Sequence, residues 1–341
     1  MLRRFITFVL LLAVAAALLV LAFPQALGLQ QHYYIAQLIA FRGVLVGISL
    51  VAFVVFLLVA IIARPVRGFF GGAATLLIVF ALISSGVLFE RGPGDDKFKA
   101  VETGDVTVLS WNTRGGAPGA SRIAALALSE HATVVSLPET PKPVAEAIAA
   151  DMKKYGSAMS VLNLTYSPTD KSKSTSLLIS SKLGAYTMST DQTTTEILPT
   201  VIATPVDHTG PTIVAVHSVA PVAAYMPQWR HDLKYLSTLC GAKDTILAGD
   251  FNSTLDHLSG LGTGSATLGT CRDAALATSN AGVGTWPTNV PKLLATPIDH
   301  VMTTSDWSVS GFEVIGSEDQ AGSDHRPILA QLTPKDDAVA D

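Results

Sequence analysis

The chain has 341 residues, long enough for two domains or for one domain and a membrane anchor. Hydrophobic residues make up 49% of it and the mean hydropathy is +0.41, which is high for a protein soluble along its whole length. Most charges lie after residue 90, where 18 basic and 26 acidic residues give a net charge of −8. Such a surface disfavours non-specific binding of nucleic acid, although a local basic groove could still exist.

Three stretches without charge account for the excess of hydrophobic residues: residues 5–23, 43–63 and 68–89. At about 1.5 Å per residue, each is long enough to cross a hydrocarbon core of about 30 Å. Buried helices of soluble proteins seldom run this far without a polar face. We therefore predict three transmembrane helices and assign residues 1–90 to a multi-pass anchor in the cell membrane.

Arginines flank the three stretches unequally, and this sets the expected orientation. Arg3 and Arg4 precede the first stretch, and Arg64 and Arg67 lie near the turn between the second and third, whereas only Arg42 lies between the first and second. Basic residues in short loops favour the cytoplasmic side of a membrane. We therefore expect the N-terminus and the second loop in the cytoplasm, and the chain after residue 90 outside it.

The first stretch could instead be a cleaved signal peptide. Residues 26–28, Ala-Leu-Gly, form an acceptable small-residue cleavage site. Cleavage would leave two spans and a new N-terminus outside the cytoplasm, so the expected location of the remaining chain is the same in both cases.

The chain after the anchor has the pattern of one α/β domain. Residues 91–105 form a polar, turn-rich linker, residues 106–333 a folded domain and residues 334–341 an acidic tail. Short apolar runs that predict buried strands alternate with helical patterns. The strands are expected at residues 106–111, 133–137, 177–180, 212–216, 245–248, 298–302 and 327–332.

Two helices and one loop have clear signals in this domain. Ser121 is expected to cap one helix, and Pro227 to open another that carries an apolar face ending at Cys240. Residues 260–269 are rich in glycine but lack the pattern of a phosphate-binding loop, which favours an ordinary loop. The two cysteines, Cys240 and Cys271, lack the spacing of a zinc site. They could pair in an oxidising compartment or stay as buried thiols, and both alternatives remain open.

Polar side chains recur at or next to the ends of the predicted strands. Carboxylates, amides and histidines at the carboxyl ends of buried strands are where α/β folds build their sites. One such residue alone is usually a turn or capping residue, whereas a series of them indicates a functional site. Five members of the series follow a predicted strand: Asn112, Glu139, His217, Asp250 and Asn252. Asp299 lies inside the apolar run 298–302, and Asp324 and His325 directly precede the run 327–332.

The motifs around these residues resemble those of the endonuclease/exonuclease/phosphatase superfamily, in a membrane-anchored form of the bacterial type. They are LSWN at 109–112, LPET at 137–140, VH at 216–217, GDFN at 249–252, IDHV at 298–301 and SDHRP at 323–327. The resemblance covers residues 106–332, with GDFN and SDHRP the most specific motifs. It implies a four-layer α/β sandwich of two packed mixed β-sheets, here preceded by three transmembrane helices.

The resemblance also implies a role for each matching residue. Glu139 is expected to be the main ligand of Mg²⁺ or Mn²⁺, hard cations that prefer carboxylate oxygens, with Asn112 beside it and Asp324 supporting the metal or the water. Asp250 is expected to orient or deprotonate the attacking water, and Asn252 to hold a phosphate oxygen.

Two histidines complete the implied site. His217 and His325 are expected to bind the phosphoryl oxygens, and Asp299 to hydrogen-bond His325 and favour its imidazolium form. This set suits an anionic phosphoester, whose charge must be neutralised while water attacks in line. Neither a GxSxG nor a reactive-cysteine pattern is present.

Some residues near the motifs depart from the family or have a simpler structural role. Many family members have Gln before the metal-binding Glu, whereas this chain has Pro138. Arg114 and Arg230 are interpreted as solvated or structural residues rather than phosphate ligands. His300 follows Asp299 and should point to the opposite face of its strand.

The sequence thus predicts a divalent-metal-dependent hydrolase of phosphoesters, either a phosphodiesterase or a phosphatase, with its catalytic domain outside the cytoplasm. Its partners would be the lipid bilayer and a phosphoester that is lipid-linked or membrane-associated; nucleic acid is less favoured and no obligate protein partner is evident. The alternatives are a surface nuclease, which the net charge of −8 disfavours, and a non-catalytic membrane scaffold, which the complete motif set disfavours.

Overall fold

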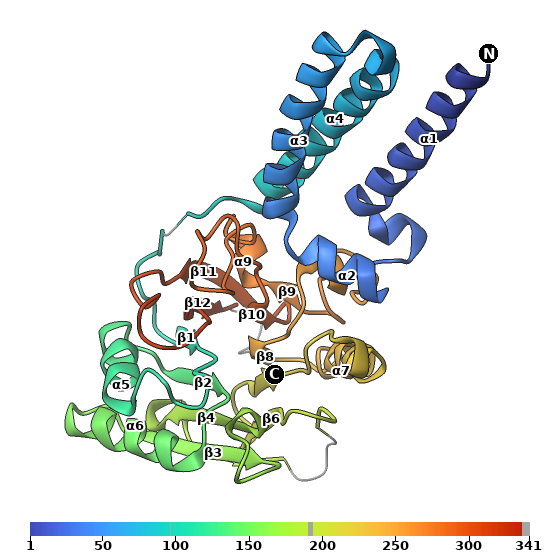
Figure 1. Cartoon of the computed structure of the whole chain (residues 1–341). Helices are drawn as coiled ribbons and strands as arrows, with labels where there is room; N and C mark the ends of the chain where they lie inside the picture. Colours follow the sequence, from blue (N-terminus) through green and yellow to red (C-terminus); the bar gives the residue numbers. More distant parts are fainter. Residues whose placement is uncertain (96, 190–193, 336–341) are drawn as a thin grey trace. The chain divides into compact units, whose positions relative to one another are not determined.

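The computed structural model describes residues 1–95, 97–189 and 194–335 (Figure 1). The chain divides into two compact units, Met1–Arg91 and Gly92–Asp341. Most of the expected acidic tail, residues 336–341, lies outside the described residues.

The first unit consists of helices α1 (Leu2–Ala22), α2 (Tyr33–Ala40), α3 (Arg42–Ile62) and α4 (Arg67–Arg91). Three segments, Leu2–Ala22, Arg42–Ile62 and Arg64–Arg91, are long and apolar enough to cross a membrane, as the sequence predicts. The short helix α2 was not predicted, because its eight residues give too short a periodic pattern. It buries Ala36 and Ile39 on one face.

A single arginine fixes the turn between α3 and α4. The last carbonyls of a helix have no partner within that helix. Arg67 donates from Nε to the carbonyl oxygen of Ala60 at 2.9 Å and from Nη2 to that of Ile61 at 3.2 Å. The Arg67 guanidinium therefore caps the C-terminal end of α3.

The second unit contains two six-stranded sheets. The first has the order β11-β12-β1-β2-β4-β3, with strands Trp307–Val314, Ile328–Pro334, Val106–Ser110, Val134–Pro138, Ser174–Ser180 and Met159–Thr165. The second has the order β5-β6-β7-β8-β10-β9, with strands Tyr186–Met188, Val201–Pro205, Thr212–His217, Thr245–Asp250, Asp299–Thr303 and Arg272–Asp273. The sheets are mixed, because β1–β2 and β7–β8 pair in parallel and the other pairs are antiparallel.

The two sheets pack face to face around one apolar core, and helices cover the outer faces, as expected of the four-layer sandwich (Figure 1). A second core lies between the first sheet and its helices α5 and α6. The helices of this unit are α5 (Ala120–Ser129), α6 (Lys142–Lys154), α7 (Met226–Leu239), α8 (Leu255–Leu258) and α9 (Ala274–Ala277). Short 3₁₀ turns lie at Pro24–Leu27, Arg64–Val66, Lys171–Lys173, Ser181–Leu183 and Ala223–Tyr225.

Several elements differ from the sequence-based expectation. The strands β3, β5, β6, β9 and β11 and the helices α6, α8 and α9 were not predicted. Most of β3 is half-exposed, so its side chains do not alternate clearly, and β11 contains a bulge between Val309 and Gly311 that breaks the period of two. The prediction that Ser121 caps a helix was wrong, because α5 begins after Gly119, whose φ of 85° suits glycine.

The expected linker is packed against its own domain. Gly92 accepts a hydrogen bond from the Gly282 nitrogen at 3.0 Å, and the amide of Lys99 donates to the Ser310 carbonyl at 2.9 Å. Gly92 has a φ of 87°, and a Cβ there would lie 1.9 Å from the Ser279 carbonyl oxygen, so only glycine fits. The second unit therefore begins at the residue that directly follows α4.

Cys240 and Cys271 form a disulfide, which settles the alternative that the sequence left open. The bond joins Cys240, at the C-terminal end of α7, to Cys271, which lies just after the glycine-rich segment 260–269. That segment is a loop, as expected. It closes a segment with a sequence separation of 31.

We predict that replacing both Cys240 and Cys271 with serine lowers the free energy of unfolding by about 3 kcal/mol, because the unfolded chain loses a covalent constraint. Urea unfolding of the full chain, with and without a reducing agent, measures this. The reducing agent should destabilise the parent protein and leave the double variant unchanged. Equal sensitivity of both proteins would contradict the assignment.

Candidate active site

The topology of both sheets brings the predicted polar residues to one edge. The parallel pair β1–β2 carries Asn112 and Glu139 just past its carboxyl ends, and the parallel pair β7–β8 ends in His217 and Asp250. Strand β10 runs antiparallel to β8, so its first residue, Asp299, lies opposite Asp250. Strand β12 is antiparallel to β1, so the segment before it, with His325, reaches the same edge.

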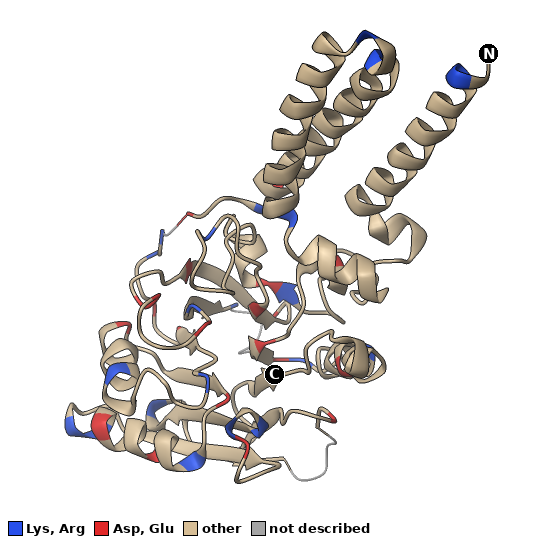
Figure 2. Cartoon of the chain, viewed as in Figure 1, with Lys and Arg blue, Asp and Glu red and all other residues tan. Residues whose placement is uncertain are grey.

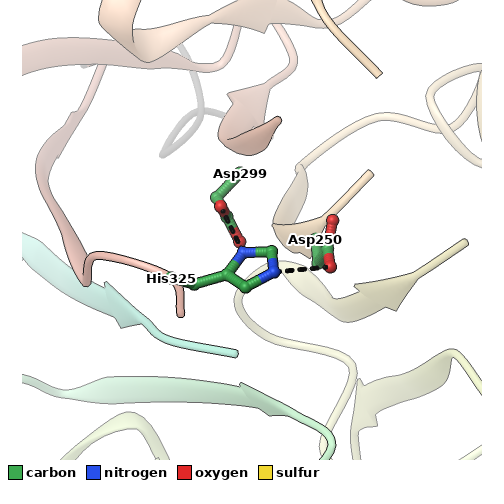
Figure 3. Close-up of side chains that lie close together, drawn as sticks. All are labelled: Asp250, Asp299 and His325. Carbon is green, nitrogen blue, oxygen red and sulfur yellow. Dashed lines mark hydrogen bonds and ion pairs between the residues drawn. The ribbon is translucent and has the colours of Figure 1, made fainter. Parts of the chain in front are cut away.

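Asp250, Asp299 and His325 form the buried centre of the site (Figure 3). Nδ1 of His325 lies 2.9 Å from Oδ2 of Asp299, a hydrogen bond. Nε2 of His325 lies 3.7 Å from Oδ2 of Asp250, which is too long for a hydrogen bond. The Nε2–H group is therefore oriented by Asp299 and still able to donate to a substrate oxygen.

The charges of this centre shift its pKa values in directions that suit proton transfer. Burial alone would lower the pKa of the His325 imidazole, but Asp299 and then Asp250 outweigh it and raise the pKa to about 10. Burial raises the pKa of the Asp250 carboxyl to about 7, against the opposing effect of His325. His325 is thus an imidazolium at neutral pH, and Asp250 has the basicity that a general base needs.

Glu139 and Asn112 lie beside this centre. The Asn112 amide nitrogen donates to Oε1 of Glu139 and to Oδ2 of Asp250, both at 3.0 Å, so it holds the two carboxylates at a fixed spacing. The Asn112 amide oxygen accepts from the backbone nitrogen of Arg114 at 3.0 Å. For this oxygen to bind a metal beside Glu139, the Asn112 amide group would have to flip.

Glu139 is held in a conformation that local sequence does not favour. Its φ is 53°, in the left-handed region that few non-glycine residues adopt. Burial raises the pKa of its carboxyl, while the hydrogen bond from Asn112 lowers it and the charge of Asp324 raises it further. The site therefore contains an excess of carboxylate charge that a cation would offset.

Two groups of residues are candidates for holding a divalent cation. Ligand atoms of Asp250, Asp299 and His325 lie within 4.8 Å of one another, which is the spacing of a metal site. However, His325 would have to give up the proton that the two carboxylates stabilise. Glu139 retains 24% exposure of its side chain and offers the hard oxygen that Mg²⁺ and Mn²⁺ prefer. The donor set thus fits such an ion best at Glu139.

His217 lies next to Glu139 but is not charged. Its Nε2 is 4.0 Å from Oε1 of Glu139. Burial, followed by the charge of His325, lowers the pKa of His217 to about 3. At neutral pH it is a neutral imidazole, which can donate one N–H to a phosphoryl oxygen but brings no positive charge before substrate binds.

Asn252 and Asp324 lie at the margin of the cluster. The Asn252 amide nitrogen donates to the carbonyl oxygen of Ser218 at 2.9 Å, and its backbone nitrogen donates to Oδ1 of Asp250 at 2.8 Å. Asp324 accepts from the indole nitrogen of Trp286 at 3.1 Å. All eight predicted residues are thus brought to one edge of the sandwich, and the roles assigned to them remain predictions.

Several supporting residues escaped the sequence analysis. The Ser323 hydroxyl donates to the carbonyl oxygen of Asn112 at 2.6 Å and accepts from the His325 nitrogen, and Trp111 donates from its indole to the His325 carbonyl at 2.8 Å. The Thr285 hydroxyl accepts from the backbone nitrogen of Asp299 at 3.3 Å. Ser323 and Trp111 stand inside the recognised motifs and could have been suspected, whereas Thr285 and Trp286 lie in a segment without a motif.

His300 points away from the site, as strand alternation predicts. Its Nδ1 lies 2.7 Å from Oδ2 of Asp273 and its Nε2 2.8 Å from the carbonyl oxygen of Ser253. Burial lowers the pKa of His300, but the charge and hydrogen bond of Asp273 outweigh this and raise it. The buried His300–Asp273 pair therefore holds the segment that follows Asp250, on the face of β10 opposite the site.

The sequence profile of the endonuclease/exonuclease/phosphatase family matches residues 109–325, more than half of the chain and nearly all of the sandwich. The chain belongs to this family. Family members are phosphoesterase hydrolases and typically use divalent metals. None of the curated proteins compared with the chain is significantly similar to it in sequence.

Solved structures share the fold. Danio rerio TDP2, humanized by 14 mutations, superposes with a TM-score of 0.51 at 16% identity, covering 67% of this chain and 99% of that one. The family protein from Leptotrichia buccalis C-1013-b gives a TM-score of 0.50 at 13% identity, and D. rerio TDP2 with a single-strand DNA product gives 0.50 at 16%. Each of these two comparisons also covers 67% of this chain and 99% of the other. At such identities the likeness shows the fold alone.

We predict that Glu139→Gln lowers phosphoesterase activity by at least about a hundredfold and weakens its dependence on Mg²⁺, because one charged oxygen ligand is lost. Turnover of a chromogenic phosphoester across a Mg²⁺ titration measures this. Glu146→Gln, on the exposed face of α6, is the matched control and should be unaffected. Full activity of the parent protein in excess chelator would contradict the metal-dependent mechanism.

Asp299→Asn should lower turnover by about two to four orders of magnitude, because the His325 imidazolium loses its charged partner. Combining it with His325→Ala should cost little more than either change alone, since the two residues act as one unit. The control is Asp207→Asn in an exposed turn. Multiplicative losses in the double variant would show that the two residues act independently.

Proposed function

We propose that the protein is a membrane-anchored, Mg²⁺- or Mn²⁺-dependent phosphoesterase that acts outside the cytoplasm on a lipid-linked phosphoester. The observation that carries the chemistry is the Asp299–His325–Asp250 arrangement beside Glu139. It combines an oriented imidazolium, a carboxyl of raised pKa and a hard-oxygen ligand within one cluster.

The residues of this cluster have complementary roles in hydrolysis. Asp250 accepts a proton from the attacking water as the water oxygen bonds to phosphorus. The ester P–O bond breaks, and the leaving oxygen departs with the bonding electron pair and takes up a proton from solvent. His325 donates from Nε2 to the phosphoryl oxygens, where negative charge develops, and Asp299 holds its ring in place. The bound cation, held by Glu139 with Asn112 and Asp324 nearby, would supply further positive charge there.

No enzyme nucleophile is needed for this reaction. Both cysteines of the chain are joined in the disulfide, so neither offers a thiolate. Asp250 is buried and held by Asn112 and by the backbone nitrogen of Asn252, which suits a base fixed in position rather than a group that forms a covalent intermediate. Direct attack by water is the simpler course.

Two observations support a location outside the cytoplasm. The first is the position of four arginines at the N-terminal end of α1 and at the turn between α3 and α4: Arg3, Arg4, Arg64 and Arg67 (Figure 2). Basic residues favour the cytoplasmic side for these ends, which leaves the chain after α4 on the other side. The disulfide between Cys240 and Cys271 favours an oxidising compartment, since thiols are kept reduced in the cytoplasm. The two lines of support are independent, because one rests on the anchor and the other on the catalytic domain.

Attachment to the membrane favours a substrate that is itself in the membrane. The second unit begins at Gly92, directly after the last residue of α4, so no free linker separates the domain from the anchor. A short tether raises the effective concentration of lipid headgroups at the domain. The net charge of −8 after residue 90 would in turn repel a polyanion such as nucleic acid.

The topology prediction is tested with a reporter enzyme that is active only outside the cytoplasm. Fused after Asp341, it should be active, because four arginines hold the opposite ends of the spans in the cytoplasm. The matched control is the same reporter fused after Val66, which should be inactive. Activity of a cytoplasm-only reporter at Asp341 would contradict the proposed orientation.

The substrate prediction is tested by comparing hydrolysis of phospholipid and polyprenyl-phosphate liposomes with that of single- and double-stranded DNA, all with Mg²⁺. We expect lipid phosphoesters to be hydrolysed faster. A protease site inserted between Arg91 and Gly92 provides the control: cleavage should slow lipid hydrolysis and leave a soluble chromogenic phosphoester unaffected. DNA cleavage faster than that of every lipid would favour a surface nuclease, and inactivity towards all of them a non-catalytic scaffold.

A further inference from the structure

We propose that the membrane unit binds one anionic phospholipid between α1 and α4, with the phosphate at Arg3 and Arg4 and an acyl chain running along the two helices. The binding site is separate from the catalytic centre, so the proposal does not depend on the proposed function. It rests on the shape, charge and lining of a cavity within the first unit.

A cavity of about 700 Å³ opens between the first turns of α1 and the start of α4. Arg3, Arg4 and Thr7 contribute its polar lining, and Ile6, Leu10 and Phe69 contribute apolar lining. This volume lies in the range of about 300–1,000 Å³ typical of small-molecule sites. The cavity is therefore amphipathic, with cations towards one end of the spans.

The arginines of this cavity lack an acidic partner. The sequence has no Asp or Glu before Glu90, so the anchor offers no carboxylate at this end. Among the described residues, the side chains of Arg3 and Arg4 have no hydrogen bond or ion pair, whereas the Arg67 side chain already donates to the carbonyls of Ala60 and Ile61. Two unpaired guanidinium groups at a membrane surface attract an anion, and phosphate suits their planar donor geometry.

The apolar part of the cavity favours a lipid over a free phosphate ion. The cavity extends along α1 to Leu10, and the helices then close where Leu11 packs on Gly72. A Cβ at Gly72 would lie 2.6 Å from Cδ1 of Leu11, so a larger residue there would displace the Leu11 side chain. Beyond it, a second cavity of about 390 Å³ between the same helices is lined by apolar residues alone. A free phosphate ion would leave this apolar groove unfilled, whereas an acyl chain matches it.

The experiment is native mass spectrometry of the full chain in detergent, titrated with phosphatidylglycerol or phosphatidylcholine, with chelator present to prevent turnover. We expect the anionic lipid to bind at least about tenfold more tightly. Arg3→Gln combined with Arg4→Gln should abolish this preference. Arg3→Lys with Arg4→Lys keeps the charge that sets topology and should retain part of it, because lysine lacks the planar fork.

Two further variants distinguish this site from non-specific lipid adsorption and from binding at the catalytic centre. Leu10→Trp fills the cavity without changing charge and should displace the lipid. Glu139→Gln alters the catalytic centre and should leave lipid binding unchanged. Equal affinity for the two lipids, undiminished binding in the glutamine variant of the two arginines, or complete displacement of phosphatidylglycerol by inorganic phosphate would each overturn the proposal.

Discussion

The site depends on contacts that cross from one sheet of the sandwich to the other. His325 belongs to the segment leading into β12 of the first sheet, and its partner Asp299 begins β10 of the second. Asn112, after β1 of the first sheet, bonds Asp250 at the end of β8 of the second. Neither pair can form until the two sheets pack, so the cluster is assembled only in the complete sandwich.

This arrangement has a cost that the surrounding structure offsets. Asp250, Asp299 and His325 are buried, and charged groups removed from water are unfavourable unless they are paired. The imidazolium of His325 between two carboxylates supplies the pairing, and Asn112 adds a hydrogen bond. The remaining excess of negative charge, around Glu139, is what a divalent cation would neutralise. The negative charge that folding leaves uncompensated is therefore available to bind a cation.

Three kinds of feature have a local signal in the sequence and could be predicted from it. The long apolar helices are marked by the length of their apolar stretches, and the central strands by short apolar runs. The polar residues of the site are marked by their positions at or near the ends of those runs. Strands such as β3 and β11 lack that signal, since half-exposed side chains and a bulge hide the alternation. Thr285 was missed for another reason. Its hydroxyl bonds the backbone of Asp299 fourteen residues further on, a contact that only the tertiary structure defines.

The two units carry net charges of opposite sign, and this limits the ways in which an anionic substrate can reach the site. The only charged residues before Glu90 are five arginines, whereas the chain after residue 90 has a net charge of −8. Long-range attraction of an anionic phosphoester to the second unit is therefore unfavourable, and the His325 imidazolium, like any cation held beside it, would act only at close range. A substrate that diffuses within the membrane would need no such attraction, because a membrane anchor would confine the protein and that substrate to one surface. Salt should consequently change the hydrolysis of a soluble polyanion more than that of a bilayer lipid.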